Sequence, residues 1–119
     1  MKKILIDAHT HTVASGHAYS SLQEMARAAA DKGLEVLGIT EHGPSVPGTC
    51  PLLYFKNMFV VPRQMYGIRL LLGCEVNILD TKGSIDMPDD YLDYLTSSSP
   101  ASIAHGIMGA RRRRTHRGC

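Results

Sequence analysis

The amino-acid sequence predicts an α/β fold built on a parallel sheet. Two short runs of apolar and β-branched residues, 4–6 and 34–40, flank a segment with helical periodicity, which is the order of a βαβ unit. A third run of this kind covers residues 68–77. Polar side chains follow all three runs, and in α/β folds functional sites form at the carboxyl ends of strands.

The first three predicted elements have recognisable boundaries. Residues 4–6 are expected to form a short buried strand that leads into the polar segment 7–11. The helix is expected to begin after Ser21, which can form a capping box with Glu24, and to end at Gly33. Residues 34–40 follow as the second strand, so the two strands are predicted to be parallel.

The later part of the chain is expected to contain a loop, a short helix, a third strand and the start of a further helix. Residues 43–51 are rich in proline and glycine, which predicts a loop long enough to cover a site. Residues 52–67 could hold a short helix interrupted at Pro62. Residues 68–77 are the third predicted strand, and a further helix is expected to begin at Asp89, after Pro88.

Composition restricts the class of protein. The chain has 119 residues, 44% hydrophobic and 20% charged, as expected for a soluble globular domain or part of one. Its apolar runs are far shorter than the roughly 20 residues of a membrane-spanning helix, and it lacks the apolar run of a signal peptide. Three cysteines, an odd number without metal-finger spacing, argue against a disulfide framework. We therefore expect a cytoplasmic protein with no membrane partner.

Charge divides the chain into two parts. Residues 1–95 carry all 11 acidic residues, whereas residues 96–119 carry five arginines and no acid. One hypothesis is a small basic protein that binds nucleic acid through Arg111–Arg114 and Arg117. The tail has no aromatic residue for base stacking and no helical pattern, which argues against a nucleic-acid partner. We predict a folded domain over 1–95 and a basic, low-complexity tail over 96–119.

Metal-binding residue types are concentrated at the predicted strand ends. His9 and His11 alternate along an extended segment, so their imidazoles point to the same side and can bind one divalent ion. Alone, such a pair is more often a surface dipeptide. The second strand ends at Glu41 and His42 and the third reaches Glu75, where a carboxylate is costly to bury without a partner. With His17 added, the four histidines and Glu75 predict a multinuclear metal site.

Four segments resemble the first motifs of the PHP family, named for polymerase and histidinol phosphatase: residues 7–11 (DAHTH), His17, residues 38–42 (GITEH) and residues 73–77 (GCEVN). Within the family, the chain is most similar to stand-alone bacterial phosphatases of the YcdX type. The resemblance implies a distorted TIM-like barrel of seven β/α units, incomplete in this chain, that holds up to three zinc or manganese ions and hydrolyses phosphate esters.

The resemblance also implies roles for individual residues. His9, His11 and Glu75 would hold the first ion, Glu75 would bridge to a second, and His17 with His42 would hold a third. Asp7 would orient a ligating imidazole. Mixed imidazole and carboxylate ligands suit zinc or manganese, and metal-bound water would attack a small phosphorylated substrate. Arg63 could clamp a phosphate, although a surface arginine is the simpler interpretation.

The resemblance is expected to end after Leu95. With one permitted choice of codons, moving the reading frame of residues 96–102 back by one base gives Asp-Ile-Val-Ile-Ala-Ser and an apolar residue, as in a buried strand. The next codon permits histidine at Ile103, where the family continues with a histidine ligand. We interpret residues 96–119 as a frameshifted tail on a truncated domain, in which His105, His116 and Cys119 have no family role.

The leading hypothesis is a metal-dependent phosphomonoesterase whose activity is weak or absent in this chain. Three alternatives stay open: a fragment of a polymerase-associated exonuclease of the same family, a noncatalytic metal-binding fragment, and the basic nucleic-acid-binding protein. The sequence leaves the natural substrate, the metal and the oligomeric state undetermined.

Overall fold

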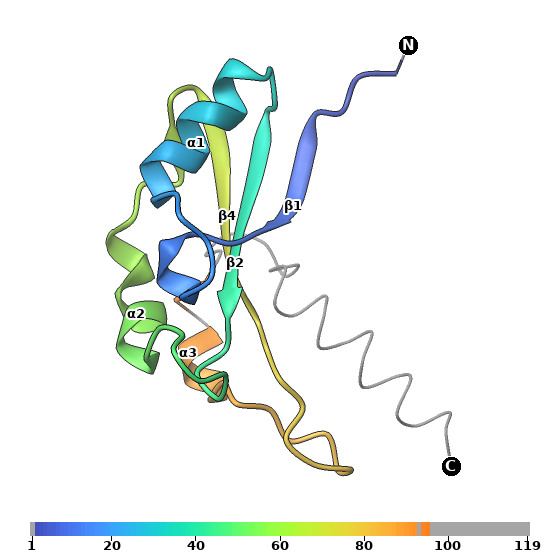
Figure 1. The fold of residues 1–119 in the computed structure, drawn as a ribbon, viewed down its shortest axis with the longest axis vertical. Coiled ribbons are helices and arrows are strands. Elements are labelled where there is room, and N and C mark those ends of the chain that lie inside the picture. Colours follow the sequence, from blue (N-terminus) through green and yellow to red (C-terminus); the bar gives the residue numbers. More distant parts are fainter. Residues whose placement is uncertain (1, 93, 96–119) are drawn as a thin grey trace.

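The computed structural model describes residues 2–92, 94 and 95, and within them the chain forms a four-stranded sheet. The strand order is β1-β2-β4-β3 (Figure 1). β1 and β4 both pair in parallel with β2, while the short β3 is antiparallel to β4. The strands are β1 (Ile6–Thr10), β2 (Val36–His42), β3 (Gln64–Met65) and β4 (Ile68–Glu75). The predicted α/β class and parallel pairing are confirmed, and closure into a barrel stays a prediction.

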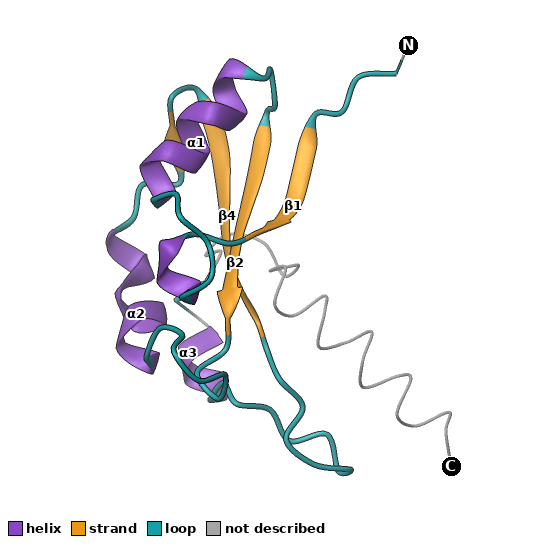
Figure 2. Ribbon diagram, in the orientation of Figure 1, coloured by secondary structure: helices purple, strands orange, loops and turns teal. Residues whose placement is uncertain are grey.

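The helices lie together on one side of this sheet (Figure 2). α1 packs against β2 and β4, and α3 contacts α2. No helix in the described part of the chain has both the length and the apolar character to span a bilayer. The helices are α1 (Leu22–Asp31), α2 (Leu52–Lys56) and α3 (Asp89–Leu92), with 3₁₀ turns at Val13–Ser15 and Asn57–Val60.

α1 begins and ends where the sequence predicts. The Ser21 side chain accepts a hydrogen bond from the Glu24 backbone N–H, and the Glu24 carboxylate accepts one from the Ser21 backbone N–H. Gly33 follows the helix with a φ of 81°, a left-handed conformation that favours glycine. The helix buries Ala26 and Ala29 against the sheet, so its small residues allow close packing.

Alternation along β2 and β4 separates the core from the opposite face of the sheet. Leu37 is paired in register with Leu70, and Ile39 with Leu72, and all four side chains are buried in the core. The intervening residues point to the other face, because side chains alternate along a strand. The carboxyl ends of β2 and β4 therefore present alternate residues to two different environments.

Besides small shifts in the ends of the second and third strands, the first strand and β3 differ from the sequence prediction. The first strand begins at Ile6 rather than at residue 4, and it is not buried: Ile4 is 75% and Ile6 56% exposed. The reason is that β1 is an edge strand of the described sheet, away from the helices. β3 was not predicted. It forms a two-residue hairpin with β4 through Tyr66 and Gly67, both with positive φ.

Asp86 joins the loops that follow β2 and β4. Its carboxylate accepts hydrogen bonds from the backbone N–H and hydroxyl of Ser45, and from the backbone N–H and side-chain amide of Asn77. Gly43 lies so close that a Cβ there would come within 2.4 Å of the carboxylate. Asp86 therefore holds together the two loops that leave the carboxyl ends of the central strands.

We expect Asp86→Asn to reduce the free energy of unfolding at neutral pH by about 1–3 kcal/mol, because an amide cannot accept all four hydrogen bonds. Burial opposes ionisation of Asp86, but the hydrogen bonds from Asn77 and Ser45 outweigh it and lower its pKa below the ordinary value. A lowered folded-state pKa gives stability that is present above the unfolded-state pKa and is lost as the pH falls through the folded one. Urea unfolding of both proteins should therefore show the difference shrinking below about pH 4.

The exposed Asp31→Asn is the matched control, and we expect it to change stability little at any pH. A constant difference between Asp86→Asn and the unmodified chain from pH 7 to pH 3 would contradict the role assigned to the ionised Asp86.

Candidate metal centre

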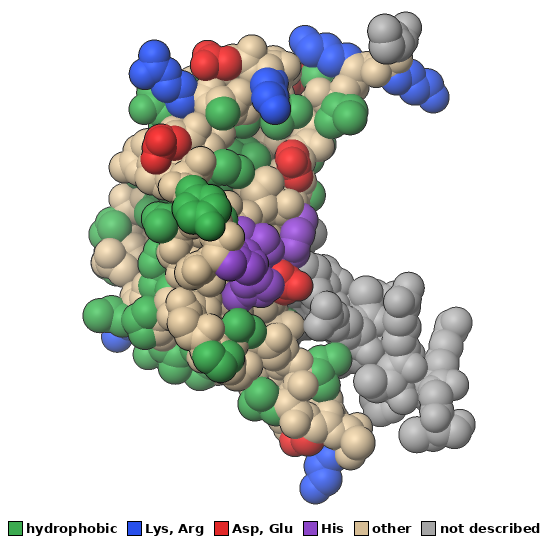
Figure 3. Space-filling view, in the orientation of Figure 1, with side chains coloured by type: hydrophobic (Ala, Val, Ile, Leu, Met, Phe, Trp, Pro, Cys, Tyr) green, Lys and Arg blue, Asp and Glu red, His purple; other side chains and the backbone are tan. Residues whose placement is uncertain are grey.

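Histidine side chains from two strand ends gather in one patch beside an acidic side chain (Figure 3). His9 lies in β1 and His11 directly follows that strand. His42 and Glu75 are the last residues of β2 and β4, and the parallel register pairs them directly. The predicted convergence of strand-end side chains is therefore present in the structure.

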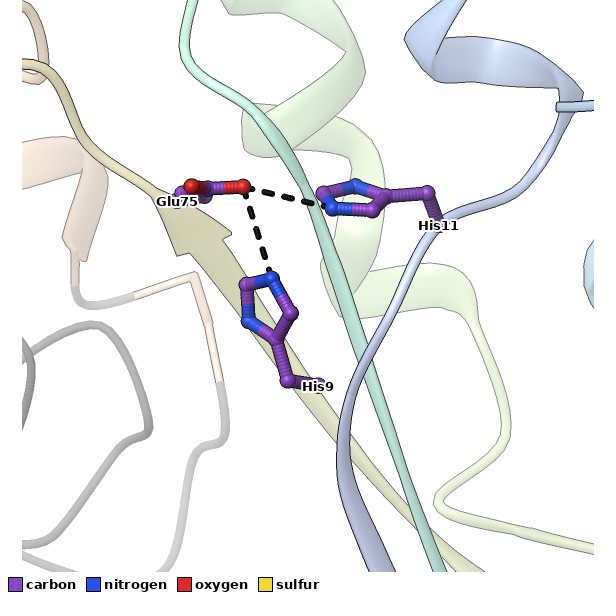
Figure 4. A group of neighbouring side chains, drawn as sticks. All are labelled: His9, His11 and Glu75. Atoms are coloured by element: carbon purple, nitrogen blue, oxygen red, sulfur yellow. Dashed lines mark ion pairs between the residues drawn. The ribbon is translucent and has the colours of Figure 1, made fainter. Parts of the chain in front are cut away.

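One carboxylate oxygen lies at the centre of the cluster. Glu75 Oε2 is 3.5 Å from His9 Nε2, 3.2 Å from His11 Nε2 and 3.2 Å from His42 Nδ1. His9, His11 and Glu75 point toward one another, with their candidate ligand atoms within 4.8 Å (Figure 4). Yet Glu75 Oε2 is buried and has no hydrogen-bond partner. A buried carboxylate oxygen without a hydrogen bond is costly, so its surroundings suit a cation.

The spacing of these atoms fits a divalent metal ion. Zinc binds imidazole nitrogen and carboxylate oxygen at about 2.0–2.2 Å, so neighbouring ligand atoms of a tetrahedral site lie roughly 3.4 Å apart. Burial, together with the nearby His42 and His9 rings, lowers the pKa of His11. This favours the neutral imidazole, which is the form that binds metal. The donor set of His9, His11 and Glu75 therefore suits zinc or a similar ion.

His17 and His42 form a second pair of potential ligands beside the first group. Their Nε2 atoms are 2.7 Å apart. The His42 ring also stacks on His11, with ring centroids 4.3 Å apart and an angle of 13° between the planes. All four histidines and Glu75 named from the sequence thus lie in one continuous cluster.

Glu41 does not join this cluster, although it ends the second strand beside His42. It is completely buried on the opposite face of β2, paired in register with Cys74. Its carboxylate accepts hydrogen bonds from the backbone N–H and hydroxyl of Thr12, the hydroxyl of Ser15 and the hydroxyl of Tyr54. Burial and the neighbouring Glu41 charge raise the pKa of Tyr54, so its hydroxyl stays a donor. Alternation along the strand explains the difference: Glu41 points away from the side on which His42 lies.

Asp7 and Arg63 have partners in the structure other than those expected. Asp7 Oδ1 accepts a hydrogen bond from the backbone N–H of His9, at 3.3 Å, and it is the Thr40 hydroxyl that contacts the His9 imidazole. The guanidinium of Arg63 donates to the backbone carbonyls of Met58, Val61 and Tyr94. Arg63 thus ties chain segments together, and the orienting role of Asp7 stays a prediction.

Sequence reasoning did not identify Ser15 and Thr40, whose hydroxyls contact the imidazoles of His11 and His9. Alternation along β2 could have found Thr40, because it lies on the same face as His42. Ser15 lies in a short 3₁₀ turn after His11, and no pattern in the sequence marks it. The expectations for residues 96–119, including His105, His116 and the frameshift, lie outside the described residues.

The chain is similar to several bacterial proteins named as probable phosphatases. A probable phosphatase of Acetivibrio thermocellus is 51% identical over 90 residues, covering 76% of this chain and 37% of that protein. A probable phosphatase of Clostridium novyi is 54% identical over 88 residues, and the match covers 74% of this chain and 36% of that protein. One from a Thermoanaerobacter species is 47% identical over 93 residues, covering 78% and 38%. The chain thus spans somewhat over a third of the length of the curated relatives it matches.

The family model of the PHP domain matches residues 7–115. This range includes every residue of the histidine and glutamate cluster, and it reaches past Leu95, where the resemblance was expected to end. The matched range covers most of the chain, and the probable phosphatases align with three quarters of it. The chain belongs to the PHP family.

Proposed function

We propose that this chain provides the first metal-binding half-site of a metal-dependent phosphatase that acts on phosphate monoesters. The observation that carries the proposal is Glu75 Oε2, a buried carboxylate oxygen with three imidazole nitrogens within 3.5 Å and no hydrogen bond. Relatives named as probable phosphatases support the reaction class. The substrate we propose is a small phosphorylated molecule.

Each part of the cluster has a separate task in this proposal. His9, His11 and Glu75 would hold a divalent ion, which supplies an activated water and neutralises charge on the phosphoryl oxygens when bound. The stacked ring of His42 limits the movement of His11. His17 and His42 offer a second pair of nitrogens on the same side of the sheet. The protein therefore supplies oriented imidazoles and a desolvated carboxylate, and the affinity for the metal ion depends on both.

We expect the dialysed 119-residue chain to retain about one zinc or manganese ion and to hydrolyse a chromogenic phosphate monoester far more slowly than the full-length relatives. The reason is that His9, His11 and Glu75 make one set of three ligands, while His17 and His42 supply only two nitrogens for another. One ion cannot stabilise both the attacking and the leaving oxygen as a two-metal site does. Elemental analysis and the esterase assay are the measurements.

His9→Ala is the variant that tests the assignment, and it should retain much less metal than the unmodified chain. Three retained ions, or turnover equal to that of a full-length relative, would contradict the proposal. Faster hydrolysis of a chromogenic phosphodiester than of the monoester would instead favour the exonuclease branch of the family.

A further inference from the structure

Two buried hydroxyl groups contact the ligand imidazoles on the side away from Glu75. Ser15 Oγ lies 3.3 Å from His11 Nδ1, and Thr40 Oγ1 lies 3.1 Å from His9 Nδ1. Both histidines turn their other nitrogen, Nε2, toward Glu75. Ser15 is 4% exposed and Thr40 0%, so water cannot readily replace these contacts. The direction of each hydrogen bond therefore determines which imidazole nitrogen carries the proton.

The direction at Ser15 follows from its other partners. A hydroxyl has one proton to donate and two lone pairs that accept. Ser15 Oγ lies 2.9 Å from Glu41 Oε1 and accepts from the His42 backbone N–H at 3.0 Å. Glu41 Oε1 is an acceptor, because it also takes the Thr12 backbone N–H at 2.7 Å, and Oε2 faces the Thr12 and Tyr54 hydroxyls. Ser15 must donate its proton to Glu41, so its remaining lone pair accepts from the Nδ1–H of His11.

The same proton count applies at Thr40. Thr40 Oγ1 lies 3.1 Å from the carbonyl oxygen of Thr10, which has no proton to give. If Thr40 donated to His9 instead, two unprotonated oxygens would face each other at hydrogen-bond distance. Thr40 therefore donates to the Thr10 carbonyl and accepts from the Nδ1–H of His9.

We propose that Ser15 and Thr40 are positioning residues that hold His11 and His9 in the Nδ1–H tautomer, so that both Nε2 lone pairs face a metal ion. The nitrogen that binds a metal is set by the hydrogen bond that the other nitrogen makes. In this tautomer neither Nε2 carries a proton, so the lone pairs of both nitrogens lie beside Glu75 Oε2. The role of Ser15 and Thr40 in metal binding rests on the proposed function, whereas the tautomers of His9 and His11 follow from the hydrogen bonds alone.

The test is nitrogen-15 NMR of the imidazoles in the metal-free, full 119-residue chain near pH 8. The unmodified chain should show protons on Nδ1 of both His9 and His11. Thr40→Val keeps the shape of the side chain but removes the hydroxyl, so His9 should shift toward the Nε2–H tautomer while His11 is unchanged. Zinc affinity, measured by chelator competition, should fall about 10- to 100-fold.

Thr40→Ser is the matched control, because it keeps the hydroxyl, and both its His9 tautomer and its zinc affinity should stay close to those of the unmodified chain. Ser15→Ala is a poorer test, since it also removes bonds to Glu41 and His42. A proton on Nε2 of His9 in the unmodified chain would overturn the proposal, even if Thr40→Val did not fold. Unchanged zinc affinity in a folded Thr40→Val protein would overturn the positioning role. Correct tautomers in a chain that binds no metal would leave the assignment standing and contradict the proposed function.

Discussion

Glu75→Gln is expected to lower the affinity for zinc by more than about 100-fold, beyond the range of 10- to 100-fold typical of residues that only surround ligands. Glu75 is the one anionic member of the cluster, and its Oε2 lies within 3.5 Å of three imidazole nitrogens. An amide keeps the shape of the side chain but removes the charge that attracts a cation. Isothermal titration with zinc measures the loss directly.

The same substitution should act in the opposite direction on the metal-free protein. Glu75 Oε2 is buried without a hydrogen bond, so the unmodified protein bears a desolvation cost that an uncharged amide reduces. The Tm of metal-free Glu75→Gln should equal or exceed that of the unmodified chain. Zinc at 100 times its Kd adds about 2.7 kcal/mol to the unmodified chain, which should raise its Tm by about 10 °C or more, and the variant should lose this increase.

Glu35→Gln provides the control, because Glu35 is exposed, directly precedes β2 and lies at the opposite end of that strand from His42. It should change neither zinc affinity nor the Tm. An unaltered zinc affinity in Glu75→Gln would remove Glu75 from the metal site, and a large fall in the metal-free Tm would show that its carboxylate serves the fold instead.

Glu41→Ala is expected to reduce the free energy of unfolding by about 3–5 kcal/mol. Its carboxylate is completely buried, and the substitution leaves donors of Thr12, Ser15 and Tyr54 without an acceptor. A domain is stable by only about 5–15 kcal/mol, so much of the protein should unfold at moderate temperature. Chemical denaturation followed by circular dichroism measures the loss.

Tyr54→Phe tests the contribution of a single hydrogen-bond donor while keeping the Glu41 carboxylate. It removes one donor and leaves Glu41 with three, so we expect a loss of about 1 kcal/mol. If Glu41→Ala is too unstable to study, Glu41→Gln retains an acceptor and should lie between the two. A loss below about 1 kcal/mol for Glu41→Ala would show that these hydrogen bonds contribute little to stability.

Local sequence predicted those elements whose ends carry their own markers. α1 was predicted because Ser21, Glu24 and Gly33 define both ends within the sequence. Strand limits were shifted: the second strand was expected over residues 34–40 but runs from Val36 to His42. Pairing with β4 continues through two polar residues, and a prediction based on apolar character ended too early. β3 was missed because two residues are too few to form a pattern.

The convergence of the histidines and Glu75 was predictable for a simple physical reason, whereas the hydrogen bonds around Glu41 were not. Parallel strands bring their carboxyl ends to one edge, so His9, His11, His42 and Glu75 could be expected to meet. The hydrogen bonds to Glu41 come from residues far away in the sequence, and its role as a buried acceptor depends on which face of β2 it occupies. The sequence prediction placed Glu41 and His42 together at a strand end and did not distinguish the two faces of the strand.

The opposite orientations of Glu41 and His42 have a consequence for how this protein can change during evolution. An insertion or deletion of one residue in β2 would exchange the two faces, placing the carboxylate among the histidines and the imidazole in the apolar core. Binding and folding would fail in the same step. Selection for either property therefore preserves the length of this strand, and variation in length should be confined to the loops beyond it.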